Sequence, residues 1–168
     1  PREDKLGLLF YSKHPWESIR LVSEFGFPTV EATFALPEGN MRLLGVHPYP
    51  PLTAGLARDR NAFLVEFGDY AAGLSGSVLG VGDFNLTPWS PHFQDLLSRG
   101  DLRDSGLGRG IQNTWYKFPT LLCGLPIDHV LTREIAVVHR HISPPIGSDH
   151  RAITVDFLLR SANQSPHQ

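Results

Sequence analysis

The chain has 168 residues, of which 41% are hydrophobic, enough for one domain of ordinary size with a hydrophobic core. Its formal net charge of −2 and its lack of any Lys/Arg block exclude a protein that attracts nucleic acid through overall charge, so such binding would need a local basic patch. The single cysteine, Cys123, excludes an intrachain disulfide and a thiolate zinc cluster, and we expect it to be a buried or semi-buried structural thiol.

Short apolar runs predict four strands in the first third of the chain, over residues 6–11, 19–23, 29–36 and 41–46. Residues 37–40 have the composition of a turn, so the last two of these strands are expected to form a hairpin. The proline-rich segment 48–55 excludes regular structure, because proline fixes φ and lacks a backbone N–H.

Two helices are expected in the middle of the chain. Apolar residues recur at helical spacing over residues 56–74, which predicts a helix with one apolar face. A short apolar strand follows over residues 77–81. Ser90 is a suitable N-cap and Pro91 a suitable first helical residue, which predicts a second helix that ends at Ser98.

The last third begins with residues 99–125, which are rich in glycine and lack periodicity, so we expect an irregular loop region. Three strands then close the fold, over residues 127–132, 135–141 and 152–159. Residues 161–168 form a polar tail that we expect to be disordered. Strands interspersed with two helices, without a linker, predict one α/β or α+β layered domain over residues 1–160.

Four short segments place ionisable residues at the ends of apolar strands, where side chains are held rigidly outside the core. In the first, His47 is either a surface-loop histidine or an imidazole that binds or protonates a phosphate oxygen. In the second, Asp83 and Asn85 project to the same side of a strand, two residues apart. They form either an Asx turn that caps the strand or a carboxylate–amide pair that holds a hard cation and orients a water.

The third segment begins a strand with Asp128, a carboxylate in apolar surroundings that requires a partner, followed by His129, which is exposed on the opposite face if it has no role. The fourth places Asp149, a candidate metal ligand, and His150, a candidate acid or base, directly before the last strand. Each segment alone is a weak signal, whereas the set in this order is a strong one: His47, Asp83, Asn85, Asp128, Asp149 and His150.

These segments resemble the motifs of the endonuclease/exonuclease/phosphatase superfamily, which includes DNase I-like nucleases, apurinic endonucleases, sphingomyelinases and inositol-phosphate phosphatases. The matching stretches are Gly45-Val46-His47, Gly82-Asp83-Phe84-Asn85, Ile127-Asp128-His129-Val130-Leu131 and Ser148-Asp149-His150-Arg151. The resemblance implies a four-layered α/β sandwich, with two β-sheets face to face and flanking helices. It also implies that this chain is the C-terminal part of the domain and lacks the N-terminal strands.

The resemblance further implies hydrolysis of a phosphate ester by an activated water, with Mg²⁺ or Mn²⁺ as the cofactor. It assigns the activation of the water to Asp83 and its positioning to Asn85, and names both as metal ligands together with Asp149. His47 and His150 would stabilise the charge of the transition state. Asp128 would hydrogen-bond His150 and fix its tautomer.

The substrate class stays open among DNA, a lipid headgroup and a small phosphate, and the aromatic residues Trp89 and Trp115 are expected near the site. Trp115 is expected to serve mainly in packing. Family members carry a further asparagine and a metal-binding glutamate in their N-terminal half, and neither Glu31 nor Glu38 lies in the expected motif. The alternative function is therefore a catalytically incomplete fragment that acts as a binding or interaction module.

A truncated sandwich would expose an apolar sheet face, so self-association is a further expectation. A zinc hydrolase is a third possibility with little support, because the H-x-H pattern of His139 and His141 is expected to lie in the middle of a strand. No apolar run approaches the roughly 20 residues of a membrane span, and no segment has the pattern of a signal peptide. Because the chain starts without Met, we expect a fragment or an engineered start, which leaves the compartment open.

Overall fold

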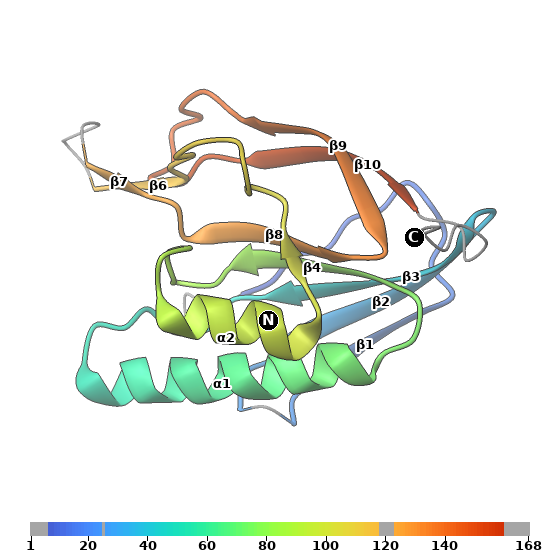
Figure 1. The fold of residues 1–168 in the computed structure, drawn as a ribbon, viewed down its shortest axis with the longest axis horizontal. Coiled ribbons are helices and arrows are strands. Elements are labelled where there is room, and N and C mark those ends of the chain that lie inside the picture. Colours follow the sequence, from blue (N-terminus) through green and yellow to red (C-terminus); the bar gives the residue numbers. More distant parts are fainter. Residues whose placement is uncertain (1–6, 25, 118–122, 160–168) are drawn as a thin grey trace, which may run out of the picture.

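The computed structural model describes residues 7–24, 26–117 and 123–159, and within these it has ten strands and two helices (Figure 1). In chain order they are β1 (Ser18–Val22), β2 (Thr29–Leu36), β3 (Gly39–Val46), α1 (Ala54–Gly73), β4 (Ser77–Asp83), α2 (Pro91–Gly100), β5 (Arg103–Asp104), β6 (Trp115–Tyr116), β7 (Gly124–Leu125), β8 (Asp128–Arg133), β9 (Ile135–Ile142) and β10 (Ile153–Leu159).

The main sheet has six strands in the order β1-β2-β3-β4-β8-β5. Its neighbours are antiparallel except β3 and β4, which are parallel because α1 returns the chain to the start of the sheet between them. β9 and β10 form a separate antiparallel pair, and β6 and β7 form a short one. The carboxyl ends of β3 and β4 therefore lie side by side at one edge.

The two helices begin and end where the sequence supplies suitable caps. The side-chain oxygen of Thr53 accepts a hydrogen bond from the N–H of Leu56 (3.2 Å) and caps α1. Pro91 starts α2, and Asp101 ends it in the left-handed conformation. Both helices pack against each other on the same face of the sheet (Figure 1).

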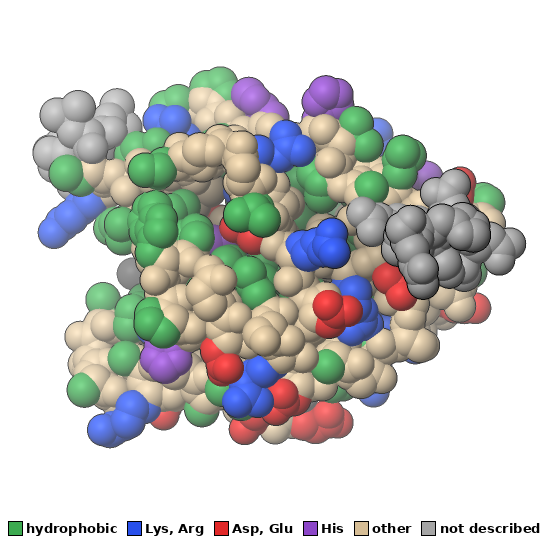
Figure 2. Space-filling model, in the orientation of Figure 1, with side chains coloured by type: hydrophobic (Ala, Val, Ile, Leu, Met, Phe, Trp, Pro, Cys, Tyr) green, Lys and Arg blue, Asp and Glu red, His purple; other side chains and the backbone are tan. Residues whose placement is uncertain are grey.

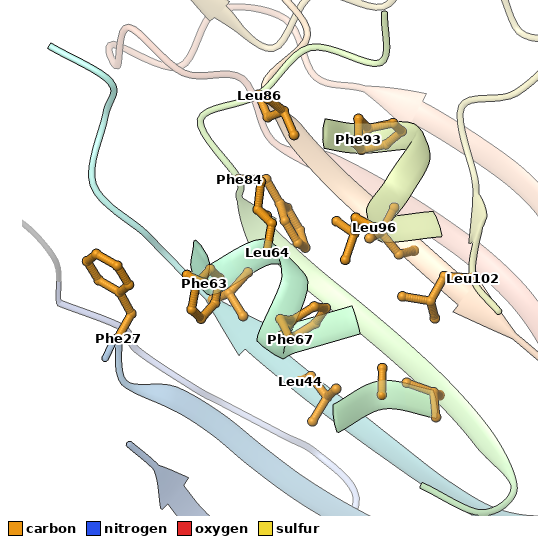
Figure 3. Packing of buried hydrophobic residues seen from close by; sticks show 14 residues of the cluster. Phe27, Leu44, Phe63, Leu64, Phe67, Phe84, Leu86, Phe93, Leu96 and Leu102 are labelled. Atoms are coloured by element: carbon orange, nitrogen blue, oxygen red, sulfur yellow. The ribbon is translucent and has the colours of Figure 1, made fainter. Parts of the chain in front are cut away.

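Two hydrophobic cores lie on the two faces of the main sheet. Leu44 and Leu131 point toward the helices and join a cluster with Phe63 and other side chains of α1 and α2 (Figure 3). Their neighbours Leu43 and Val130 point the other way, into a second cluster that β9 and β10 cover. Because side chains alternate between the two faces of the main sheet, one face packs against the helices and the other against β9 and β10, which gives a layered structure. The mixed α/β sandwich expected from the sequence is confirmed.

The expected strands and helices from residue 18 onward are confirmed to within two residues at each end. The strand expected over residues 6–11 is wrong in its described part, because residues 7–11 have no regular structure and Leu9 and Tyr11 are exposed. Residues 99–125 are less irregular than expected, since their described part holds the two-residue strands β5, β6 and β7, which are too short to produce a periodic pattern.

Cys123 is exposed, so the expectation of a buried structural thiol is wrong. The expected tail over residues 161–168 lies outside the described residues. Among the helices that the structure describes, none combines the length and the apolar character needed to cross a membrane.

Candidate active site

Three strands of the main sheet bring acidic and histidine side chains to one edge. His47 directly follows β3 and Asp83 is the last residue of β4, so the parallel pairing of these strands places the two residues next to each other. β8 runs antiparallel to β4 and starts with Asp128, which lies opposite Asp83 in the register. The topology of the sheet is therefore what assembles the first three residues of the site.

His150 reaches the same edge from the segment before β10. An isolated bridge pairs it with Trp115, and the backbone N–H of Arg151 donates to the carbonyl of Thr114 (2.7 Å). The hydroxyl of Thr114, which is fully buried, accepts hydrogen bonds from the N–H groups of Ile127 (3.2 Å) and Asp128 (3.1 Å). Thr114 thus joins the His150 segment to the start of β8.

The carboxylate of Asp83 lies between two imidazoles. Its Oδ2 is 3.8 Å from Nε2 of His47 and 3.9 Å from Nε2 of His150. These are ion-pair distances rather than hydrogen bonds, so a small group can sit between the carboxylate and either ring. His47 is therefore part of the cluster and not an isolated surface-loop histidine.

His150 is oriented by Asp128. Its Nδ1 lies 2.9 Å from Oδ2 and 3.1 Å from Oδ1 of that carboxylate. Because a carboxylate only accepts, Nδ1 carries a proton, and Nε2 faces Asp83. The hydrogen bond to Asp128 raises the pKa of His150, and burial opposes it only in part, so the imidazolium form persists to higher pH than usual.

Asp83 is an unusually basic carboxylate. Burial, followed by repulsion from the charge of Asp128, raises its pKa from the ordinary 3.8 to about 6. The backbone N–H of Asn85 donates to its Oδ1 (2.7 Å) and acts in the opposite direction. Asp83 and Asn85 thus form an Asx turn, while Oδ2 of Asp83 faces the two histidines.

Asn85 is held by two interactions and has a left-handed backbone, with φ of 51°. Its side-chain N–H₂ donates to the carbonyl of Pro48 (3.0 Å), which ties the loop after β3 to the loop after β4. Its own carbonyl accepts a hydrogen bond from the guanidinium of Arg60 on α1. Asn85 therefore links the loop after β3, the loop after β4 and α1.

A cavity of about 680 Å³ opens over these residues. His47, Asp83, Asn85, Asp149 and His150 are all part of its lining. Apolar groups complete the walls, among them Pro50, Pro51, Leu52, Trp115 and Leu125. A small phosphate ester fits this volume, and the lining combines ionisable groups with apolar side chains.

Asp149 lies at the rim of the cavity. It is exposed, and its Oδ2 accepts a hydrogen bond from the indole N–H of Trp115 (3.2 Å). Trp115 was expected to serve in packing, whereas it lines the cavity and holds Asp149.

Three residues of the described chain are close enough to share an ion. One ligand atom each from Asp83, Asp128 and His150 lie within 4.8 Å of one another. Two carboxylates and an imidazole suit a divalent cation, and a cation would relieve the repulsion that raises the pKa of Asp83. This group shares Asp83 with the ligands expected from the sequence, while Asn85 and Asp149 lie in the lining of the same cavity.

Two residues that support the site were not singled out from the sequence as functional. Arg60 is buried on α1, and a charged residue on the buried face of a helix is itself a signal in the sequence. His129 is not exposed but 2% accessible, with Nε2 2.7 Å from the carbonyl of Leu86 and its ring against Phe93. Burial lowers its pKa, so it remains neutral and anchors the loop after Asp83.

Glu31 does not replace the missing family glutamate. It is buried on β2, where it accepts hydrogen bonds from Arg20 (2.9 Å) and Tyr70. These hydrogen bonds hold the carboxylate of Glu31 between the sheet and α1. Among the residues that the structure describes, Asp83 and Asp149 are the acidic residues of the cavity lining, and Asp128 joins Asp83 in the cluster that could hold an ion.

Comparison with solved structures identifies the fold. The chain is similar to an endonuclease/exonuclease/phosphatase from Beutenbergia cavernae, with 20% identity and a TM-score of 0.65 over 88% of this chain and 46% of that one. A humanized D. rerio TDP2 is similar at 16% identity and a TM-score of 0.68, over 85% of this chain and 67% of that one. The human Nocturnin catalytic domain is similar at 18% identity and a TM-score of 0.59, over 79% and 53%.

The chain spans about half the length of the Beutenbergia cavernae structure. No curated protein shows a significant sequence match. Residues 1–150, however, match the sequence profile of the Endonuclease/Exonuclease/phosphatase family, and they include the whole set from His47 to His150. The chain therefore belongs to the endonuclease/exonuclease/phosphatase family.

Proposed function

We propose that this chain hydrolyses a phosphodiester with water as the nucleophile and with a divalent cation as cofactor. The observation that carries the proposal is the position of Asp83, a basic carboxylate between the Nε2 atoms of His47 and His150 in the lining of the cavity. Hydrolytic phosphoesterases need a base for the water and positive charge for the phosphoryl oxygens, and this cluster offers both.

Each residue has a distinct part in the reaction. Asp83 accepts the proton of the attacking water, for which a pKa of about 6 suits a base that works near neutral pH. The backbone N–H of Asn85 fixes the carboxylate through Oδ1, and its amide oxygen aligns the water. His150, kept protonated by Asp128, donates from Nε2 to a non-bridging oxygen as charge develops there. His47 contacts the other side of the same group.

The proposed cofactor is Mg²⁺ or Mn²⁺, held by Asp83 together with Asn85 or Asp128, with Asp149 as a further ligand from the rim. When bound, such an ion neutralises charge on the phosphoryl group. Oxygen ligands dominate the set and no cysteine lines the cavity, which favours these hard ions over zinc. His139 and His141 lie within β9, as expected, and outside this lining.

The proposal is tested by release of product from bis-p-nitrophenyl phosphate and from plasmid DNA in Mn²⁺. We expect turnover by the wild type and at least about 100-fold less by Asp83→Asn and His47→Ala, because each removes a group that acts in the transition state. Asp156→Asn, an exposed aspartate on β10 with the same loss of charge, is the matched control and should retain turnover.

A catalytically incomplete binding module is the second candidate. It is favoured by the structural role of Glu31 and by the absence of glutamate from the cavity lining among the described residues. This candidate predicts Mn²⁺-dependent binding of a phosphodiester without turnover. Binding that disappears in Asp83→Asn, with no product from the wild type at any Mn²⁺ concentration, would decide in its favour.

A further inference from the structure

A second polar pocket, of about 320 Å³, lies beside the segment that carries His150. Three separate stretches of the chain contribute its polar lining, namely Gln112, Asn113, Tyr116, Arg140, His141 and Arg151. Two guanidinium groups and an imidazole meet here, and none of the lining residues is Asp or Glu. The fold thus assembles a basic site that the sequence, with no Lys/Arg block, does not reveal.

Arg140 is the central group of this basic pocket. It is half-buried on β9, and uncharged partners hold it: Oε1 of Gln112 (2.6 Å) and Oγ of Ser105 (2.6 Å). Its hydrogen-bond partners carry no charge; the carboxylate of Asp104 raises the pKa of Arg140 and Arg109 lowers it, but burial is the largest influence and lowers this pKa. An anion in the pocket would offset part of the cost of burying this guanidinium.

Arg151 provides the second cation. Its guanidinium carbon lies 4.2 Å from the centre of the Tyr116 ring, a cation–π contact that fixes the direction of the side chain. Preformed guanidinium groups present forked N–H donors that match phosphate oxygens. The pocket therefore has the charge, the donors and the rigidity of a phosphate site.

The basic pocket has a fixed position relative to the catalytic cavity. Trp115 and His150 form a bridge and both line the catalytic cavity, whereas the next residues, Tyr116 and Arg151, both line the basic pocket. Side chains alternate along extended backbone, so the two sites lie on opposite faces of one paired segment. A ligand that places one phosphate in the catalytic cavity and another group of the same charge in the basic pocket must carry more than one phosphate.

A third cavity, of about 270 Å³, adjoins the basic pocket. It shares Ile111, Gln112 and Arg140 with that pocket, and its lining also includes Asp128 of the catalytic cluster and Asp104. Two further lining residues are Trp89, which is 63% exposed, and Ile111, which is 72% exposed. An exposed aromatic side chain close to a basic pocket suits single-stranded nucleic acid, whose bases stack on aromatic rings while its phosphates contact the cations.

The distribution of charge over the surface agrees with this arrangement. In Figure 2 most acidic side chains lie in the lower half, over the helices, while Lys, Arg and His dominate the upper half around the β6–β7 and β9–β10 pairs. A hollow separates the two halves in the same view. A polyanion is consequently attracted to the half that holds the basic pocket.

We propose that the basic pocket binds a phosphate group of a single-stranded polynucleotide at a position away from the scissile phosphate. The proposal rests on the hydrolysis proposed above and names its substrate class. A small phosphate ester has no second phosphate for Arg140 and Arg151, and a lipid headgroup does not supply a flat ring for the exposed indole of Trp89.

The test is the affinity of the full chain for a fluorescent octanucleotide relative to a dinucleotide, measured by anisotropy in EDTA. The wild type should prefer the octanucleotide, and Arg151→Gln should lower this preference about tenfold, the effect of losing a charge-assisted contact. The slope of log affinity against log salt concentration should also decrease in magnitude by about 0.7, as expected for the loss of one phosphate contact on a single strand. Arg58→Gln, an exposed arginine on α1, is the matched control and should change neither value.

Arg140→Gln should act in the same direction, and its thermal unfolding shows whether the half-buried position still folds. Equal length preference in the wild type and in Arg151→Gln would overturn the proposal. Arginine-dependent binding to phosphatidylglycerol vesicles, with octanucleotide binding unaffected, would overturn it in favour of a lipid surface. Arginine-dependent length preference in a chain that turns over no phosphodiester would support the pocket and reject only the hydrolysis.

Discussion

Asp83 destabilises the fold at neutral pH, because its ionised form is buried beside a second carboxylate. Its pKa in the folded state is about 6, against an ordinary 3.8, so the folded state binds the proton more tightly than the unfolded chain. Stability therefore falls as pH rises from about 4 to 6, and above that range the penalty is complete, at about 3 kcal/mol for this difference in pKa.

Asp83→Asn should remove this penalty. In EDTA, we expect its free energy of unfolding to exceed that of the wild type by about 3 kcal/mol at neutral pH, with the difference vanishing near pH 4. Urea denaturation across this pH range measures both values. A variant that is less stable than the wild type at neutral pH, or a difference that does not depend on pH, would contradict the position assigned to this carboxylate.

The Asp128–His150 pair should control the alkaline side of the activity profile. Asp128 raises the pKa of His150, and the raised value keeps the imidazolium charged until pH passes above it. Asp128→Asn should shift the alkaline limb to lower pH and reduce kcat about 10–100-fold, because the ring loses both its charge partner and its orientation. The pH–rate profile is the measurement, and a uniform decrease with an unmoved limb would indicate a purely structural role.

The contact between β3 and β4 depends on a glycine. Gly82 has a φ of 150°, and a Cβ at this position would lie 1.9 Å from the carbonyl oxygen of Val46. Gly82→Ala should therefore separate the two parallel strands, lower stability by on the order of 3 kcal/mol and disturb the neighbouring Asp83. Gly73→Ala, at the end of α1 with open space around its Cβ, is the matched control. Thermal unfolding of both variants distinguishes a local steric clash from a general effect of glycine replacement.

The elements that have a periodic pattern could be predicted from the sequence, and those that depend on partners could not. The apolar face of α1 and the alternation in β10 are local patterns, so their bounds follow from the residues themselves. β5 and β6 exist because β8 and β7 provide neighbours, and two residues carry no periodic signal. That residues such as His47 and Asp83 come together could be predicted, because they lie at strand ends and match the family motifs in order.

Other parts of the site required the structure. His129 was predicted to be exposed if it lacked a role, and only the aromatic cage of Phe84 and Phe93 shows why it is buried. The pairing of Asp128 with His150 was expected through the family resemblance, but its geometric cause, the register of β4 with β8 and the bridge at Trp115, appears only in the structure. The roles of the metal ligands stay predictions.

For the molecule as a whole, cation binding should be coupled to unfolding. An ion that binds only the folded chain adds about 2.7 kcal/mol of stability at 100 times its Kd. Mn²⁺ should therefore raise the Tm of the wild type in a concentration-dependent manner and leave the Tm of Asp83→Asn nearly unchanged, because the cluster loses a ligand. Calorimetry at several Mn²⁺ concentrations tests this, and an equal rise in both proteins would place the ion elsewhere.

The self-association expected from an exposed sheet face stays a prediction, because the described structure contains one chain and no contact between copies. β9 and β10 cover the second core that lies against the main sheet. Exposed apolar side chains nevertheless remain on this pair, including Val138 and Leu158.

The order of the site residues along the chain has a consequence during protein synthesis. His47 and Asp83 are made before Asp128 and His150, and Thr114 joins the two later segments only when β8 and the bridge to Trp115 have formed. While these later residues are still being synthesised, the nascent chain therefore has not assembled the cluster.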